Sequence, residues 1–561
     1  MVMYAGFQPW TVRRRFGAVF PVFACFFWFL CTLRADIVYL DEAGNIVSSE
    51  KTGIDEAGNI VVVPSEKAEQ EKAVPPREAE DENANADFPA MTEDWLDWIV
   101  DGHGKRFDLN DDGVEVVFNG DSIAGAVLRF VPPDAVHLVI PDGVTEIEGK
   151  AFRPCKKLES VVFPNSVERI PSNTFYENKT LKSVVIPARA SIGYSAFNGC
   201  TALESVTIVN PGDENAASPL NGASIENNAF SRCAALRTVD IPDGVKSIEV
   251  SAFTGCASLE SVSIPNSVKY IGREAFQGCR KLKTATIPVH ATIYEKAFSD
   301  CMSLESVTLT KGGEAAAPPV SEDAAIGDEA FRWCMKLKQF EFPDGIRSIG
   351  KKAFISCDME SVTVPDGVVT IGEEAFCQCA AMKTLRLPDS VKTIGKWAFI
   401  NCSLLEDLKL PAGPVDFGEK AFSSCFALKQ FKFPPITSTE LPNILYNCRG
   451  LETVELPSGI TSIGEGAFEA CHELKEIAIP EGVETIRFRA FAGCTKLERV
   501  TLPASLKTLE GCAFGWCPAL KEIAIPEGMK WIAVDAFRDT PCWGAVRREA
   551  ESRKIKIKYD Y

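Results

Sequence analysis

The sequence has few of the residues on which most enzymes depend. Its four histidines, His103, His137, His290 and His472, lie in separate segments of a 561-residue chain. It contains no H-E-x-x-H zinc motif, no G-x-S-x-G nucleophile motif and no phosphate-binding glycine loop. We therefore predict that the protein is not an enzyme, has no catalytic residues and holds no cofactor.

A metal site is not indicated either. Residues 108–113 (DLNDDG) copy the first half of a calcium-binding loop, but the twelfth position is Asn119, where an EF-hand has glutamate. Cys377 and Cys379 form a lone C-x-C pair, which is weak evidence for a metal. We expect a polar turn at 108–113 and no bound metal.

Positive charge is also in short supply. The chain has 59 lysines and arginines against 77 aspartates and glutamates, which gives a formal net charge of −18. A protein that binds nucleic acid presents a basic surface to the phosphates, so this composition argues against nucleic acid as a partner. The excess negative charge keeps a long molecule soluble, and we expect a monomer.

A long apolar run occurs at the N-terminus. Arg13, Arg14 and Arg15 precede a stretch from Phe16 to Leu33, and the small residue Ala35 follows. This order is typical of a cleavable signal peptide, although eighteen mostly apolar residues could also form an uncleaved anchor. We predict a signal peptide or N-terminal anchor at 1–35 and an exported, extracellular or cell-surface protein. Membrane contact is expected only through that anchor.

Two segments follow before the repeats begin. Residues 36–91 contain DEAGNIV twice, at Asp41–Val47 and Asp55–Val61, and then a stretch rich in Glu, Lys, Ala and Pro. Such a composition cannot bury a core, so we predict an acidic flexible linker. Residues 92–135 regain apolar residues, including Trp95 and Trp98, and are predicted to cap the first repeat.

The dominant feature is a phenylalanine slot that recurs every 22 or 23 residues, with two intervals of 33. Fifteen of its seventeen members follow an alanine, and they are Phe152, Phe175, Phe197, Phe230, Phe253, Phe276, Phe298, Phe331, Phe354, Phe376, Phe399, Phe422, Leu445, Phe468, Phe491, Phe514 and Phe537. A fixed period in this range is typical of a solenoid, in which each repeat is one coil that cannot bury its core alone. We predict a solenoid at 136–540 and a C-terminal cap at 541–561.

Within one coil the pattern predicts a strand and a turn. Val262 and Ile264 alternate with Ser261 and Ser263, and Pro265 ends the strand because proline donates no backbone hydrogen bond. Strands that recur once per coil pair in parallel with those of neighbouring coils. We expect about 17 coils in a right-handed α/β solenoid. A parallel sheet would form one face, with short strands, turns and helical turns on the other.

A cysteine follows the phenylalanine slot by three residues in fifteen coils, and Asn178 takes its place once. Equivalent positions of adjacent coils stack as a column, and free cysteine is among the residues most often buried. Asparagine can substitute because it also donates a hydrogen bond to a turn carbonyl. We predict a buried ladder of free cysteines rather than disulfides.

A charged residue follows the leucine or methionine that leads each strand, and its sign alternates without a miss. The column is Glu159, Lys182, Glu204, Arg237, Glu260, Lys283, Glu305, Lys338, Glu360, Lys383, Glu406, Lys429, Glu452, Lys475, Glu498 and Lys521. Opposite charges on neighbouring strands attract, so we interpret the column as a self-neutralising structural ladder. It also implies that the unit of duplication is two coils.

The next outward column breaks that rule, because Arg386, Lys409 and Lys432 occur on three successive coils. Adjacent like charges cost stability. One hypothesis is a basic patch for an anionic ligand, such as an acidic protein segment or a charged glycan. The alternative is that Glu406, Asp407 and solvent screen these charges. Two coils carry about ten extra residues each, within Val209–Ala223 and Lys311–Ala325, and these insertions are candidates for binding loops or for tolerated surface loops.

The repeats resemble the BspA-like, Treponema-type class of leucine-rich repeats. Leu451–Cys471 (LETVELPSGITSIGEGAFEAC) and Leu474–Cys494 match its consensus almost throughout. The resemblance implies a secreted or surface protein that recognises an extracellular protein or glycan, adhesion included, without catalysis. A structural envelope spacer and a solenoid polysaccharide lyase or hydrolase are the alternatives.

Overall fold

The computed structural model describes residues 126–559, apart from 141–142, 210–222, 311–324 and 344, together with five short strands nearer the N-terminus. The chain divides into two compact units, Met1–Thr92 and Glu93–Tyr561. In the first unit, β1 (Asp36–Leu40), β2 (Ile46–Ile54) and β3 (Ile60–Val63) form an antiparallel sheet in that order. The predicted signal segment at 1–35 lies outside the described residues.

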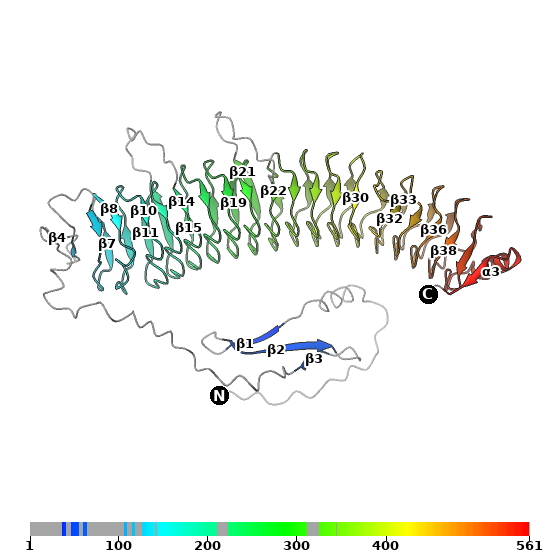
Figure 1. Ribbon diagram of the computed structural model, residues 1–561, viewed down its shortest axis with the longest axis horizontal. Helices are drawn as coiled ribbons and strands as arrows, with labels where there is room; N and C mark the ends of the chain where they lie inside the picture. The colour runs from blue at the N-terminus through cyan, green and yellow to red at the C-terminus, as the bar shows by residue number, and fades with distance from the viewer. Residues whose placement is uncertain are drawn as a thin grey trace. The chain divides into compact units, whose positions relative to one another are not determined.

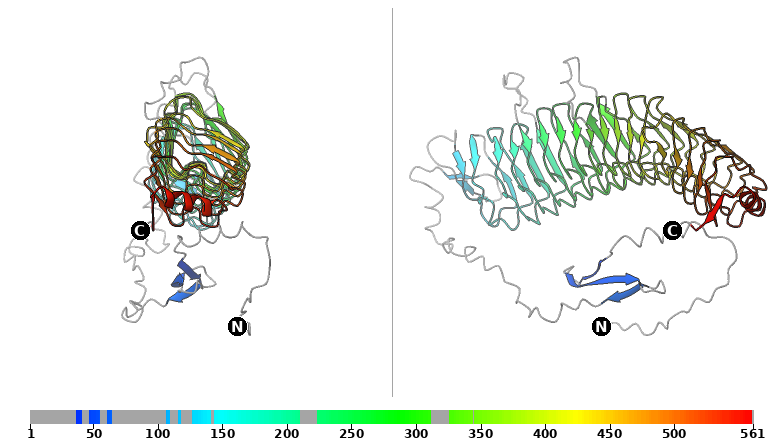
Figure 2. Two further views of the ribbon diagram at one scale, coloured as in Figure 1. Left: turned by 90° about the vertical axis from the view of Figure 1, so that its right-hand side faces the viewer. Right: turned by 45° about the vertical axis from the view of Figure 1, so that its right-hand side comes forward.

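The second unit is a solenoid whose coils stack in a single row (Figure 1). It begins with the antiparallel pair β4 (Arg106–Asp108) and β5 (Glu115–Val117), and then β6 (Ala126–Leu128) pairs in parallel with β8 (Val144–Ile147). Each regular coil has two short strands, which contribute to two different sides of the stack. Viewed along the stack, the coils superpose closely (Figure 2). The predicted parallel solenoid of about 17 coils is confirmed.

The first sheet side consists of the first strand of each coil. Its members are β7 (His137–Val139), β9 (Ser160–Val162), β11 (Ser183–Pro187), β13 (Ser205–Val209), β15 (Thr238–Val239), β17 (Ser261–Ser263), β19 (Thr284–Pro288), β21 (Ser306–Thr310), β23 (Gln339–Phe340), β25 (Ser361–Thr363), β27 (Thr384–Arg386), β29 (Asp407–Lys409), β31 (Gln430–Lys432), β33 (Thr453–Glu455), β35 (Glu476–Ala478) and β37 (Arg499–Thr501).

The second sheet side consists of the second strand of each coil. Its members are β8 (Val144–Ile147), β10 (Arg169–Ile170), β12 (Ser191–Ile192), β14 (Ser224–Ile225), β16 (Ser247–Ile248), β18 (Tyr270–Ile271), β20 (Thr292–Ile293), β22 (Ala325–Ile326), β24 (Ser348–Ile349), β26 (Thr370–Ile371), β28 (Thr393–Ile394), β30 (Asp416–Phe417), β32 (Glu440–Leu441), β34 (Ser462–Ile463), β36 (Thr485–Ile486), β38 (Thr508–Leu509), β39 (Trp531–Ala533) and β40 (Lys556–Lys558). Among the described residues the only α-helix is α3 (Trp543–Ser552), which precedes β40 and buries Val546 and Ala550.

The phenylalanine slot forms a column of buried rings inside the solenoid. The rings of Phe276 and Phe298 stack with centroids 5.0 Å apart and planes inclined by 8°. The same stacking links successive rings from Phe175 to Phe422 and again from Phe468 to Phe537. These buried rings supply a large share of the apolar area that each coil removes from water.

A tight turn on the third side of each coil presents the phenylalanine to the interior. In most coils it contains two residues with left-handed backbone conformation, such as Glu274 (φ 58°) before the alanine and Gly278 (φ 72°) before the cysteine. The Phe276 N–H donates to the Ala297 carbonyl oxygen of the next coil at 2.7 Å. The bend expected from sequence is therefore a turn that hydrogen-bonds from coil to coil.

The cysteines form the predicted buried column of free thiols. Each ladder thiol donates to the carbonyl oxygen of a residue in the preceding coil, as Cys402 does to Phe376 at 3.4 Å. Asn178 uses its side-chain N–H to donate to the Cys155 carbonyl oxygen at 3.4 Å. Burial raises the pKa of the Cys200 and Cys448 thiols to about 12, so both are protonated at neutral pH.

In the coils that carry glycine after the second strand, that glycine lies where the preceding coil approaches closely, and the chain needs no special dihedral there. A Cβ added at Gly372 would lie 2.7 Å from the Gly350 carbonyl carbon and from the Lys351 nitrogen. Gly272 and Gly395 meet the preceding coil in the same way. The sequence suggested a turn at Gly272, but its φ does not lie in the left-handed region.

The two-coil period that the charges predict also occurs in the hydrogen bonds between neighbouring coils. The Gly244 N–H donates to the Ser267 hydroxyl of the next coil at 2.9 Å, and Gly482 and Ser505 repeat the contact at 2.9 Å. The Ser505 hydroxyl in turn donates to the Val483 carbonyl oxygen at 2.9 Å. Coils that contain Asp-Gly or Glu-Gly thus pair with coils that contain a serine at the same corner.

Candidate functional site

The outer face of the first sheet side changes in chemistry along the solenoid. In three successive strands, β17 to β21, the outward residues are all hydroxylic, namely Ser261, Ser263, Thr284, Thr286, Ser306 and Thr308. From β27 onward many are charged, and these are Arg386, Asp407, Lys409, Lys432, Glu455, Glu476 and Arg499. Cations therefore enter this outward column at Arg386, where the predicted basic patch begins.

Arg386 and Lys409 occupy paired positions on the neighbouring strands β27 and β29, so two like charges lie side by side. Arg386 is compensated, because its guanidinium forms an ion pair with the Asp407 carboxylate and donates to the Asp407 carbonyl oxygen at 3.1 Å. The hydrogen bond from Arg386 lowers the pKa of Asp407 and raises the pKa of Arg386. Asp407 thus neutralises one member of the predicted patch.

Lys432 is compensated by Glu455 on the following coil, at 2.7 Å, although both side chains are largely exposed. Lys409 differs from both neighbours. Its ammonium forms no ion pair with any residue that the structure describes. The predicted patch therefore consists of two ion-paired cations with one exposed, uncompensated cation between them.

The alternating charge column forms direct contacts at some coil boundaries. Lys182 and Glu159 are 2.8 Å apart, and two further pairs, Lys383–Glu360 and Lys475–Glu452, are at 3.0 Å and 3.1 Å. In each of these pairs the glutamate lies on the earlier coil. The contacts agree with a structural ladder whose unit is two coils.

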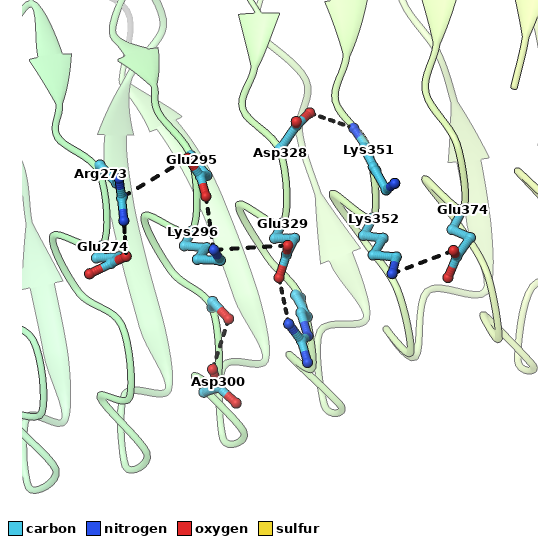
Figure 3. Close-up of polar contacts among 12 residues, drawn as sticks. Arg273, Glu274, Glu295, Lys296, Asp300, Asp328, Glu329, Lys351, Lys352 and Glu374 are labelled. Carbon is cyan, nitrogen blue, oxygen red and sulfur yellow. Dashed lines mark hydrogen bonds and ion pairs between the residues drawn. The ribbon is translucent and has the colours of Figure 1, made fainter. Parts of the chain in front are cut away.

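A second charge ladder, which the sequence analysis missed, follows the turn side of the solenoid (Figure 3). It uses the two residues before each alanine. Lys296 contacts Glu295 at 2.8 Å and Glu329 of the next coil at 4.0 Å, and Lys352 contacts Glu374 at 3.4 Å. The hydrogen bond from Lys296 lowers the pKa of Glu295 and raises the pKa of Lys296.

The sequence carried a signal for this second ladder. Aligned on the alanine, the preceding residue alternates in sign through Glu274, Lys296, Glu329, Lys352 and Glu374. The alternation ends at Trp397, whose ring lies 4.3 Å from the Lys396 ammonium. These partly buried pairs lie on the turn side and are not part of the predicted patch.

An exposed pair of tyrosines lies on the second sheet side. The rings of Tyr270 and Tyr294 meet edge to face with centroids 6.3 Å apart, and the two residues remain 38% and 50% exposed. Tyrosine is enriched among residues that dominate protein–protein binding. Their coils lie between the two coils that carry the insertions, most of whose residues, 210–222 and 311–324, fall outside the described part of the chain.

Among the described residues, no group of three or more His, Cys, Asp and Glu side chains is arranged to hold a metal ion. Cys377 and Cys379 are both buried. The calcium-like segment after Asp108 is mostly outside the described residues. No described helix has the length and apolar character that a membrane span requires.

Comparison with known proteins identifies the repeats. The family model described as "BspA type Leucine rich repeat region (6 copies)" matches residues 134–218, 213–315, 324–443 and 439–556. A search of curated proteins found no match.

Similar solved structures include a leucine-rich repeat protein from Bacteroides ovatus, with 23% identity and a TM-score of 0.45, covering 82% of this chain and 99% of that one. A leucine-rich cell surface protein from Faecalibacterium prausnitzii has 22% identity and a TM-score of 0.28, covering 74% and 93%. Because the family model matches most of the sequence, the chain belongs to the BspA-type leucine-rich repeat family.

Proposed function

We propose that this chain is an exported recognition protein. Its solenoid binds an extracellular protein or glycan through the outer face of the first sheet side, without covalent chemistry. Adhesion to another cell or to a matrix is the form of recognition we favour. Membership of a leucine-rich repeat family supports a binding role, because stacked repeats present an extended surface for multivalent contact.

One observation carries the proposal, namely the uncompensated charge of Lys409 beside Arg386. Like charges directly opposite each other on neighbouring strands are destabilising. On the same face, Lys432 and Arg499 are each compensated by a carboxylate on a neighbouring coil, Glu455 on the next coil and Glu476 on the preceding one. An anionic group of the ligand would complete the same arrangement at Lys409, and a carboxylate or sulfate fits that need.

Two binding arrays, one of matrix proteins and one of glycans, would separate recognition from the alternatives. We expect the purified chain to bind at least one matrix protein or acidic glycan, with an affinity that falls as salt is added. An envelope spacer would bind nothing on either array. A polysaccharide lyase or hydrolase would shorten the glycans that it binds, so chromatography of bound glycans after incubation tests that alternative.

Export needs its own measurement. Surface labelling and fractionation of intact cells should place the protein in the outer or extracellular fraction. Recovery only from the cytoplasm would overturn both the interpretation of residues 1–35 and the proposed extracellular ligand.

A further inference from the structure

Both sheet sides are interrupted at a single coil boundary. On the first sheet side β25-β27-β29 form one sheet and β31-β33 the next, and on the second sheet side an eleven-stranded sheet ends at β30 before another begins at β32. The coil with β29 and β30 directly precedes the coil with β31 and β32. At the other interruptions between β9 and β37 on the first sheet side, the second sheet side continues without a break.

The break on the second sheet side is explained by the sequence of the coil that contains β31 and β32. The residue after the second strand normally donates its N–H to the preceding coil, as Gly418 does to the Ile394 carbonyl oxygen at 2.7 Å and Gly464 to the Leu441 carbonyl oxygen at 2.9 Å. Pro442 occupies this position and has no N–H to donate. Pro171 occupies it in one other coil, and there too the strands β8 and β10 belong to separate sheets.

The interior changes at the same boundary. Ile444 and Leu445 replace the alanine and phenylalanine of the repeat, so the column of stacked rings stops at Phe422 and resumes at Phe468. Phenylalanines from the strands occupy the neighbouring space. Phe431 meets Phe422 with centroids 5.6 Å apart, and Phe433 meets Phe417 at 6.4 Å.

The boundary is nevertheless joined on its turn side. The Phe422 N–H donates to the Ile444 carbonyl oxygen at 2.9 Å, and the Cys448 thiol donates to the Phe422 carbonyl oxygen at 3.1 Å. The sheet sides retain one isolated bridge, between Val415 and Ile436. Directional bonds therefore hold the turn side, whereas mainly apolar contacts, which are not directional, hold the two sheet sides.

We propose that this boundary is a hinge that divides the solenoid into two cooperative segments, residues 127–427 and 428–559. In a repeat protein, stability is a sum of coil stabilities and nearest-neighbour interfaces, so one weak interface separates the cooperative units. The turn-side bonds form the axis, and the two sheet sides open or close around it. Lys409 and Lys432 lie on opposite sides of the hinge, so its angle sets their separation.

The cysteine column provides a reporter for this hinge in almost every coil. Buried thiols react with iodoacetamide only when their coil opens, so pulsed alkylation followed by peptide mass spectrometry measures the opening of each coil in the full-length chain. We expect labelling across a urea series to show two groups of thiols with different midpoints. The step should lie between Cys425 and Cys471. The shorter segment, with Cys471, Cys494 and Cys517, should open first, with labelling rates higher by about tenfold or more at intermediate urea.

A regularised variant tests the cause. The double substitution Pro442→Gly/Leu445→Phe restores a backbone donor and an aromatic ring, and it should shrink or abolish the step. Phe298→Leu is the matched control, because it places leucine in the ring column at the coil of β19 and β20, where both sheet sides are continuous. It should create no step there.

Three results would overturn the hinge. The first is a single shared midpoint for all thiols from Cys200 to Cys517 in the unmodified chain. The second is a step at a different boundary. The third is a step that persists unchanged in the Pro442→Gly/Leu445→Phe variant, which would remove these residues as its cause. The unmodified chain alone decides the first two, even if a variant fails to fold, and none of the readouts involves a ligand.

Discussion

The thiol of Cys279 donates a hydrogen bond to the carbonyl oxygen of Phe253, one coil earlier, with a sulfur–oxygen distance of 3.4 Å. The same carbonyl also accepts the Cys256 N–H of its own coil at 3.1 Å. Each cysteine therefore connects two coils at the point where the backbone turns. This contact explains why a weak donor of small volume recurs at a buried position.

Removal of one ladder thiol should weaken the solenoid locally. We expect Cys279→Ala to destabilise the surrounding coils by about 1–2 kcal/mol, because it leaves a small cavity and removes a donor. Cys279→Ser keeps a donor and should cost less than alanine if the hydrogen bond matters more than the apolar volume. Urea denaturation followed by circular dichroism measures both. Equal stability of the alanine variant and the parent would contradict the contact's role.

Alkaline pH should unfold the solenoid. Burial raises the pKa of Cys200 and Cys448 to about 12 and that of Cys279 well above its usual value, whereas an unfolded thiol ionises near pH 8.5. Between these values the folded state holds more protons, so its stability is complete below about pH 8.5 and falls as pH rises. The slope is about 1.4 kcal/mol per pH unit for each such thiol.

Urea midpoints at pH 7.5, 9 and 10 under reducing conditions test this dependence. A variant with Cys200, Cys279 and Cys448 replaced by serine should show a shallower decline than the parent. A midpoint that stays constant from pH 7.5 to 10 would show that the thiols are not held in their protonated form.

The close approach of neighbouring coils gives a sharp test at glycine. Gly372→Ala places a Cβ 2.7 Å from the backbone of the preceding coil, so the coils must separate, and we expect a loss of about 2–4 kcal/mol. Gly149→Ala is the control, because its Cβ would meet nothing closer than 3.8 Å and its φ is not positive. That variant should stay within about 0.5 kcal/mol of the parent. Similar losses for both would refute the steric explanation.

The alternating charges should respond to exchange and to salt. Lys383→Glu places three glutamates in succession at positions 360, 383 and 406, and it should lower the thermal midpoint most at low ionic strength. The double variant Glu360→Lys/Lys383→Glu restores the Glu360–Lys383 pair in reverse and should recover part of the loss. Thermal scans at low and high salt measure this loss. If the ladder has no electrostatic role, Lys383→Glu would lower the thermal midpoint by the same amount at both salt concentrations.

Much of the fold could be predicted from the sequence, because the buried positions of a solenoid recur at a fixed period. Phe276 and Cys279 reveal their burial through that recurrence. The reason for Gly272 could not be read in this way, since sequence spacing does not show how closely the preceding coil approaches. Asp407 could be named from the sequence as one residue that screens the basic patch, but its specific pairing with Arg386 could not, because it depends on the reach of a side chain across two strands.

Other features were visible but were not recognised. The alternation from Glu274 to Glu374 is as regular as that of the first ladder, yet it appears only when the coils are aligned on their alanine. The sequence shows that Leu445 departs from the repeat. Its place at a weak coil boundary becomes clear only with Pro442 and the breaks in both sheet sides.

The most direct test of the proposed recognition surface compares two triple variants on the same binding arrays. One variant replaces Arg386, Lys409 and Lys432 by threonine. The matched control replaces Lys383, Lys429 and Lys475 by threonine, and these three lysines belong to the structural ladder on the same sheet side. We predict that the unmodified chain and the control bind the same ligand, whereas the first variant loses most of that binding. Equal binding by all three proteins, or the absence of any ligand for the unmodified chain, would contradict the account.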